Sequence, residues 1–314
     1  MLTIFAMPKA FRGQFKIIQT NAIRSWTLLR PTPEVLLFGD DEGTTEIARE
    51  LGLRHMPDVE RNEYGTPLVN DIFQKGQALA SNNLVCYVNA DIILRSDFME
   101  AVKKVIRLLG GDTFLIIGRK SNVEIDWLLD FKQSDWEYKL KNLVKANGKY
   151  VTYDSDFFVF PKGMFKGIPP FAIGRCFWTQ WLVYNAWKKG GPVIDVTPIV
   201  TSVESKHDYS HATSTGGAKR LSGVEYVCNR NLFKGCKYFT TIDATHILTD
   251  SGLKKSPFKN RIVSFLVRLE YYVYFLLKGT LYPYSLPLII LFRWTKSFLQ
   301  AVSRIGKYVY KLIS

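Results

Sequence analysis

Short apolar runs alternate with helical apolar stripes along the first 120 residues. The runs are bounded by glycine, proline and aspartate, which predicts strands over residues 3–6, 34–39, 53–56, 84–88 and 113–117. Between them, apolar side chains recur every three or four positions, which predicts helices over residues 14–29, 44–51, 68–80 and 98–109. Strands separated by helix-length connections pair in parallel. The pattern therefore predicts an α/β fold with a doubly wound, mostly parallel sheet.

The alternation becomes less regular after residue 126. Helices are predicted over residues 136–146, 177–188 and 223–232, and strands over residues 156–160 and 193–196. Residues 205–222 are rich in histidine, serine, threonine, glycine and lysine, which predicts a loop. We expect one α/β domain over residues 1–250.

Residues 257–314 differ in composition from the rest of the chain. From Lys254 onward there are eleven lysine or arginine residues against one acid, Glu270, so most of the net charge of +14 lies there. Pro283 and Pro287 interrupt the apolar stretches, which are shorter than the roughly 20 residues of a bilayer span. Cations beside apolar runs favour a helical extension lying on an anionic membrane surface. A helical subdomain packed against the core or a partner chain is the alternative.

The predicted strand over residues 84–88 runs into Asn89-Ala90-Asp91. Open α/β sheets bind ligands at the carboxyl ends of their strands, where Asp91 is expected. A carboxylate there can hold a divalent cation whose other ligands are nucleotide phosphates. The alternative is a turn or helix-capping aspartate, because Ser96 and Asp97 follow closely as cap signals for the next helix.

His207 and His211 lie four residues apart in the loop over residues 205–222, and the chain has only four histidines. An imidazole can complete a coordination shell begun by Asp91 and two phosphates. The alternative is a pair of solvated loop histidines.

Several classes of protein and compartment are disfavoured. The chain has no glycine-rich phosphate loop and no Gly-x-Ser-x-Gly sequence. The four cysteines lack metal-type spacing, and the first residues lack the features of a signal peptide, which together suggest a reducing, cytosol-facing environment. The basic segment is laced with aliphatic runs, which argues against a nucleic-acid partner.

The order of these segments resembles the GT-A class of nucleotide-sugar-dependent glycosyltransferases, in particular bacterial and viral enzymes similar to family 2. The resemblance covers residues 1–250 and rests on the first strand with its proline loop, Gly39-Asp40-Asp41, residues 88–93 and residues 156–161. Those enzymes carry an Asp-x-Asp motif, which Asn89-Ala90-Asp91 matches in its final position. The resemblance implies that Asp91 binds Mn²⁺ or Mg²⁺ bridging the donor diphosphate, and that the loop holding His207 and His211 closes over the phosphates.

The resemblance also implies binding residues for both substrates. Residues 168–181 resemble the family's acceptor segment, where an acid can act as the base; Thr179 and Gln180 stand there and cannot, so Asp156 is the candidate base. Tyr64 could stack on the nucleoside base or anchor its own loop. The expected acceptor residues are Arg175, Trp178 and Trp181, and the expected donor residues are Ala6, Pro8, Asp40, Asn62, Tyr64, Asn89, Lys206 and Lys219.

The expected function is transfer of a sugar from a UDP- or GDP-sugar to a glycan or glycolipid in cell-surface polysaccharide assembly. The expected place is the cytoplasm, peripheral on the inner face of a membrane. A sugar-phosphate nucleotidyltransferase is one alternative, although residues 5–13 are poor in glycine. A non-catalytic nucleotide-sugar-binding protein is the other.

Overall fold

The computed structural model describes residues 1–110, 113–150, 153–206, 223–258, 260, 262–265 and 268. The chain divides into two compact units, Met1–Ser256 and Pro257–Ser314. Most of the predicted extension over residues 257–314 lies outside the described residues; its described residues between 258 and 268 are helical. No helix in the described part of the chain has both the length and the apolar character to cross a bilayer.

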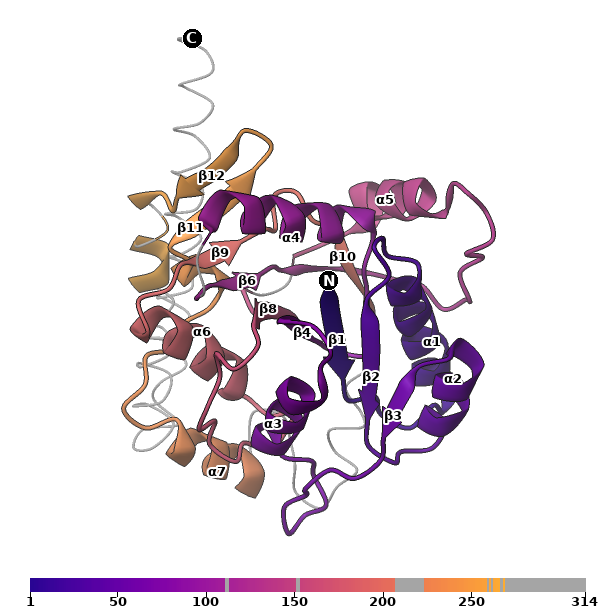
Figure 1. Ribbon diagram of the computed structural model, residues 1–314, viewed down its shortest axis with the longest axis horizontal. Helices are drawn as coiled ribbons and strands as arrows, with labels where there is room; N and C mark the ends of the chain where they lie inside the picture. The colour runs from indigo at the N-terminus through magenta and orange to yellow at the C-terminus, as the bar shows by residue number, and fades with distance from the viewer. Residues whose placement is uncertain are drawn as a thin grey trace, which may run out of the picture. The chain divides into compact units, whose positions relative to one another are not determined.

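A nine-stranded sheet forms the centre of the first unit (Figure 1). The strands run in the order β12-β11-β9-β6-β8-β4-β1-β2-β3; β8 and β12 are antiparallel to their neighbours and the other pairs are parallel. The predicted doubly wound, mostly parallel sheet is thus confirmed. Its strands are β1 (Leu2–Ala6), β2 (Glu34–Phe38), β3 (Arg54–Met56), β4 (Leu84–Val88), β6 (Leu115–Ile117), β8 (Phe157–Pro161), β9 (Val193–Asp195), β11 (His246–Thr249) and β12 (Gly252–Lys255).

Helices cover both faces of this sheet because successive strand residues point to opposite sides. The helices are α1 (Gly13–Thr27), α2 (Thr44–Leu51), α3 (Val69–Leu79), α4 (Ser96–Leu109), α5 (Trp136–Asn147), α6 (Trp178–Lys188) and α7 (Val224–Leu232). On one face, α1, α2, α4 and α5 share an aliphatic core with β1 residues Leu2, Ile4 and Ala6. On the other face, Phe5 contacts Phe73 of α3 within an aromatic cluster that reaches α6.

A second, three-stranded sheet was not predicted from the sequence. It has the order β5-β10-β7 and consists of β5 (Ile92–Ile93), β7 (Lys120–Val123) and β10 (Ser202–Ser205). Helix α1 holds its first strand: Trp26 Nε1 donates to the Ile92 carbonyl at 2.8 Å, and Leu94 N donates to Ser25 Oγ. These contacts fix the chain that follows Asp91.

Candidate functional site

The carboxyl ends of three neighbouring parallel strands, β2, β1 and β4, meet at one edge of the large sheet. The strand order reverses between β1 and β4, and such a switch point is where open α/β sheets bind ligands. Pro8 follows β1, Asp40 follows β2, and Asn89 and Asp91 follow β4. The structure therefore brings these predicted residues to the same edge.

A turn places Asp91 beyond the end of β4. Ile92 N donates to the Asn89 carbonyl at 3.1 Å, which closes a turn over residues 89–92. Asn89 also binds Asp156 twice: its backbone N donates to the Asp156 carbonyl at 2.9 Å, and its Nδ2 donates to Asp156 Oδ1 at 2.8 Å. The side chain of Asp156 therefore comes from the start of the antiparallel strand β8 to the end of β4.

The small sheet adds two charged residues that the sequence analysis missed. Strand β10 pairs with β5 so that Glu204 lies opposite Ile92, next to Asp91 in the chain. Lys120 of β7 places its ammonium between two carboxylates, at 3.0 Å from Asp156 Oδ1 and 2.8 Å from Glu204 Oε1. Asn122 Nδ2 donates to the other Glu204 oxygen at 3.1 Å. Asp91, Asp156, Glu204 and Lys120 form what we call the carboxylate cluster.

Two oxygens of the carboxylate cluster are buried without a partner among the described residues, Asp91 Oδ1 and Asp156 Oδ2. A buried carboxylate oxygen that no donor satisfies is costly, which points to a ligand. Within the described residues no group of three or more metal-type ligands is assembled. A cation shared with nucleotide phosphates needs only one or two protein carboxylates, so these two residues fit that kind of site.

The environment of Glu204 disfavours its charge. Burial, with a contribution from Asp91 and Asp156, raises the pKa of Glu204 to about 7, although Lys120 opposes the shift. Attraction to Asp156 and Glu204 raises the pKa of Lys120 against the opposing effect of burial, so Lys120 remains a cation. The carboxylate cluster therefore changes its net charge near neutral pH through Glu204.

We expect the stability of the protein to depend on pH through Glu204. Its pKa is about 7 in the folded protein against an ordinary value of 4.5, so the folded state holds the extra proton between these values. The free energy of unfolding should accordingly fall as pH rises from about 4.5 to about 7. Urea unfolding at several pH values measures this slope, and Glu204→Gln should flatten it; an identical slope in that variant would show that other groups cause it.

A separate group of polar contacts holds the expected nucleoside loop. Arg61 Nη2 lies 2.7 Å from Asp40 Oδ1 and 3.3 Å from Asp41 Oδ2, which joins the loop after β2 to residues 61–66. A hydrogen bond from its own backbone N–H and the charge of Arg61 lower the pKa of Asp40. Tyr64 is 41% exposed on the same loop. The structure thus brings Asp40 and the loop of Asn62 and Tyr64 together.

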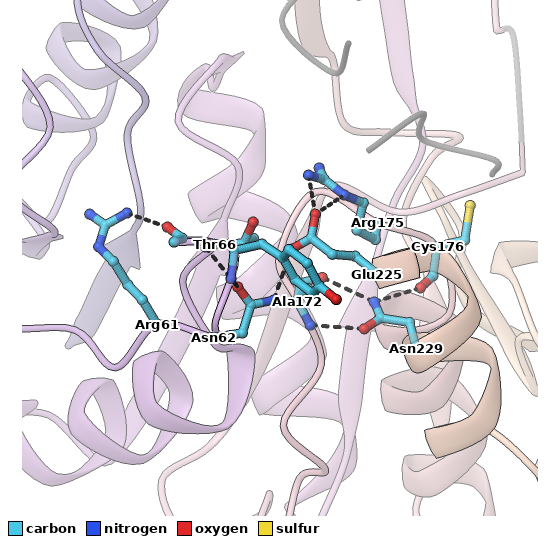
Figure 2. A network of polar contacts seen from close by, with 10 residues as sticks. Arg61, Asn62, Thr66, Ala172, Arg175, Cys176, Glu225 and Asn229 are labelled. Atoms are coloured by element: carbon cyan, nitrogen blue, oxygen red, sulfur yellow. Dashed lines mark hydrogen bonds and ion pairs between the residues drawn. The ribbon is translucent and has the colours of Figure 1, made fainter. Parts of the chain in front are cut away.

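Figure 2 shows how this loop connects to α7 and to the segment before α6. Asn62 Nδ2 donates to Glu225 at 2.8 Å, and Arg175 donates to the same carboxylate from Nε at 3.0 Å and from Nη2 at 2.6 Å. Asn229 exchanges hydrogen bonds with the backbone of Ala172 at 2.9 and 3.0 Å. Arg175, expected to bind the acceptor, therefore forms an ion pair with Glu225. Glu225 is a buried residue that was not identified from the sequence.

The expectation that Trp178 and Trp181 present ring faces to an acceptor sugar requires correction. Their exposed fractions are 4% and 8%, and the Trp178 ring contacts Phe73 and Tyr87. The Trp181 ring contacts Phe165 and Phe171. Both rings belong to the aromatic core around α6, because burying a large ring is more favourable than leaving it in water.

One of the two residues that stand where the resemblance places an acid, Thr179 and Gln180, has a structural role in this chain. Gln180 is buried; its Oε1 accepts from Phe177 N at 2.9 Å, and its Nε2 donates to Asp154 at 2.8 Å. Phe177 has φ +89°, a strained conformation for a bulky residue that this contact helps to hold. Gln180 therefore caps α6.

The remaining residues that were predicted to bind the donor or the metal differ in their burial, and some lie outside the described residues. Ala6 ends β1 inside the core and Pro8 is buried, whereas Lys206 is exposed and its backbone N donates to the Val123 carbonyl at 2.8 Å. Three predicted residues lie outside the described residues: His207, His211 and Lys219.

Comparisons with known proteins find similarity at the level of fold. No protein-family model matches the sequence. No curated protein matches it either. Among solved structures, TarS residues 1–349 from S. aureus in complex with UDP-GlcNAc is 15% identical, with a TM-score of 0.47, over 69% of this chain and 62% of that one. Glucosyl-3-phosphoglycerate synthase from Mycobacterium tuberculosis, in complex with Mn²⁺, UDP and phosphoglyceric acid, is 13% identical, with a TM-score of 0.42, over 68% of this chain and 74% of that one. The match thus spans less than two thirds of the TarS fragment.

Proposed function

We propose that the protein is a glycosyltransferase that takes its sugar from a nucleoside-diphosphate donor with the help of a divalent cation. The observation that carries this proposal is the pair of buried, unpartnered carboxylate oxygens of Asp91 and Asp156 in the described chain, at the switch point of the sheet. An anionic pair attracts a cation, and a cation attracts a diphosphate.

Different residues of the chain would bind the cation, hold its ligands in place and balance their charge. Asp91 and Asp156 would hold Mn²⁺ or Mg²⁺, which supplies positive charge for the leaving diphosphate when bound. Asn89 keeps Asp156 in place through two hydrogen bonds, and Lys120 neutralises part of the negative charge that the cluster carries without a ligand. His207 or His211, in the loop predicted from the sequence over residues 205–222, would complete the coordination shell of that cation.

The donor nucleoside would lie over Pro8, Asp40 and the loop of residues 61–66, along the carboxyl edge of β1 and β2. Arg61 already joins the two loops, so this part of the site is formed without a ligand. Tyr64 offers an exposed ring for stacking. The proposed acceptor is a glycan or glycolipid of cell-surface polysaccharide assembly.

One observation favours a second candidate, a non-catalytic nucleotide-sugar-binding protein. The two residues at which the resemblance places the acid, Thr179 and Gln180, cannot accept a proton from an acceptor hydroxyl, and Gln180 caps α6. Asp156, the base predicted from the sequence, is assigned here to the cation, and its Oδ1 already accepts from Asn89 and Lys120.

Calorimetry with a panel of UDP- and GDP-sugars, with and without Mn²⁺, tests the proposal. We expect one donor to bind in a Mn²⁺-dependent manner, and release of nucleoside diphosphate with an acceptor lipid or glycan then separates an enzyme from a binding protein. Binding without turnover across the acceptor panel would support the non-catalytic alternative. Absence of Mn²⁺-dependent binding for every donor would remove the proposal.

We further propose that residues 257–314 hold the enzyme on the cytoplasmic face of a membrane. A cation near an anionic leaflet contributes about 1 kcal/mol, and the apolar runs of this segment add burial at the interface. Flotation of the full chain with anionic vesicles should exceed that of a variant in which Arg293, Lys296, Arg304, Lys307 and Lys311 are replaced by glutamine. Equal flotation of the two would mean that this segment is a packing element.

A further inference from the structure

Two segments of the first unit contain no acidic residue. Residues 157–194 carry five lysine or arginine residues and no aspartate or glutamate, and residues 226–242 carry three basic residues and again no acid. The basic residues are Lys162, Lys166, Arg175, Lys188, Lys189, Arg230, Lys234 and Lys237. The two segments together hold 55 residues whose charged side chains are all basic. They can form a basic surface only if they lie together in the folded chain.

Contacts between residues 172–187 and residues 229–239 bring the two segments together. At one end, Asn229 Nδ2 donates to the Cys176 carbonyl at 3.0 Å, in addition to its bonds with Ala172 (Figure 2). The Phe177 ring lies 5.3 Å from the Phe233 ring. At the other end, the Trp187 ring lies 5.3 Å from the Phe239 ring. Helices α6 and α7 and the chain after α7 therefore lie together.

The outer side of this region mixes cations with an exposed aromatic ring. Trp187 is 40% exposed, and Lys237 places its Nζ 5.4 Å from the centre of that ring. Lys188 lies close enough to Cys236 to oppose the effect of burial on the pKa of that thiol. Lys234 is exposed on the turn between α7 and Lys237. We call Trp187, Lys188, Lys234 and Lys237 the basic aromatic surface.

Helix α7, which overlaps the second of these segments, also exposes apolar side chains. Its buried side carries Glu225, Tyr226 and Asn229. Its outer side carries Val224 and Val227, exposed at 53% and 42%, next to the exposed Arg230. Exposed valines beside cations match an interface whose partner is both anionic and apolar.

We propose that the basic aromatic surface docks the first unit directly on an anionic lipid bilayer. Lysines attract the headgroups, and a half-exposed tryptophan inserts between headgroup and acyl chain, where indole rings favour the boundary. A soluble polyanion would use the lysines but gain nothing from Trp187, Val224 and Val227. The inference is independent of the proposed sugar transfer.

Sedimentation of the full chain with vesicles tests the docking surface. The probes are phosphatidylcholine vesicles, the same vesicles with 30% phosphatidylserine (on the order of a plasma-membrane inner leaflet), and soluble polyphosphate. The variant K188Q/K234Q/K237Q removes three surface lysines, and K16Q/K141Q/K145Q removes three exposed lysines of α1 and α5 as a matched control. Each lysine near an anionic surface is worth about a 5-fold change, so the first variant should lose at least about 10-fold of its partitioning onto anionic vesicles.

Comparison of vesicle binding with polyphosphate binding distinguishes a lipid surface from a soluble polyanion. Trp187→Ala should lower partitioning onto anionic vesicles several-fold and leave polyphosphate binding unchanged. Equal losses in the two triple variants, or no loss in the first, would overturn the proposal. A first variant that loses polyphosphate binding but keeps vesicle binding would also overturn it, since the surface would then serve a soluble polyanion.

Discussion

Replacing Asp91 by asparagine is expected to lower sugar transfer by about 100-fold or more without changing the fold. Asparagine keeps the size of the side chain and removes the negative charge at an oxygen that no described residue satisfies. Loss of a group that stabilises developing charge in a water-excluded site typically costs 10²–10³ in rate. The Mn²⁺-dependent part of donor binding should fall with it, whereas the melting temperature should stay the same or rise, because an unpaired charge is gone.

Asp195 provides a matched control for this variant. It also ends a strand of the large sheet, β9, and burial raises its pKa, but its Oδ1 accepts a hydrogen bond from Thr197 N at 2.8 Å. Asp195→Asn should therefore leave transfer within a few-fold of the original rate. Comparable activity in the Asp91 and Asp195 variants would contradict the assignment of Asp91.

Replacing Lys120 by methionine is expected to destabilise the protein by about 3–5 kcal/mol. Methionine fills much of the same space but leaves Asp156 and Glu204 facing each other and Asp91 without a cation. Removing one partner of a buried ion pair costs more than the pair itself contributes, because the remaining charge stays buried. The midpoint of urea unfolding measures the change.

A double variant distinguishes charge from packing in this result. Adding Glu204→Gln to Lys120→Met removes one of the two carboxylates that lose their partner, and should recover about 1–2 kcal/mol of the loss. A loss below about 1 kcal/mol in the single variant, or no recovery in the double variant, would mean that Lys120 is not the cation that holds the cluster together.

The part of the site on β4 could be predicted from the sequence. Residues 84–88 are a continuous apolar run and Asp91 follows at once, so strand, strand end and carboxylate all appear within eight residues. The same holds for Asp40 after β2. These positions are local properties of the chain, which apolar patterning reports directly.

The other half of the carboxylate cluster depends on pairing between distant segments. Strands β7 and β10 have four residues each, and Lys120-Ser121-Asn122-Val123 has too little apolar character to predict a strand. Lys120 and Glu204 meet only because β7 and β10 pair in parallel, although the two residues are 84 positions apart in the sequence. The sequence held only a weak signal for this strand: an apolar residue, Val203, is followed by the polar Glu204 directly before the predicted loop of His207 and His211.

The tryptophans illustrate a different limit of sequence reasoning. An aromatic-rich helix is predicted at α6, but the Trp178 ring packs against Phe73 of α3 and against Tyr87 and Phe158 of the sheet. The spacing of apolar residues predicts the helix, but it does not predict which face of the helix packs against the sheet. Sugar-binding and core tryptophans therefore look the same in the sequence.

Asp91 and Asp156 are proposed to hold a cation bound to a nucleoside diphosphate. Anomalous diffraction from crystals grown with Mn²⁺ and UDP or GDP tests it most directly, since it locates the metal independently of the fold. We expect a peak within about 2.5 Å of Asp91 Oδ1, with the diphosphate on its other side. A peak elsewhere in the molecule, or a bound nucleotide away from the carboxyl edge of β1 and β4, would mean that these two carboxylates do not hold the cation.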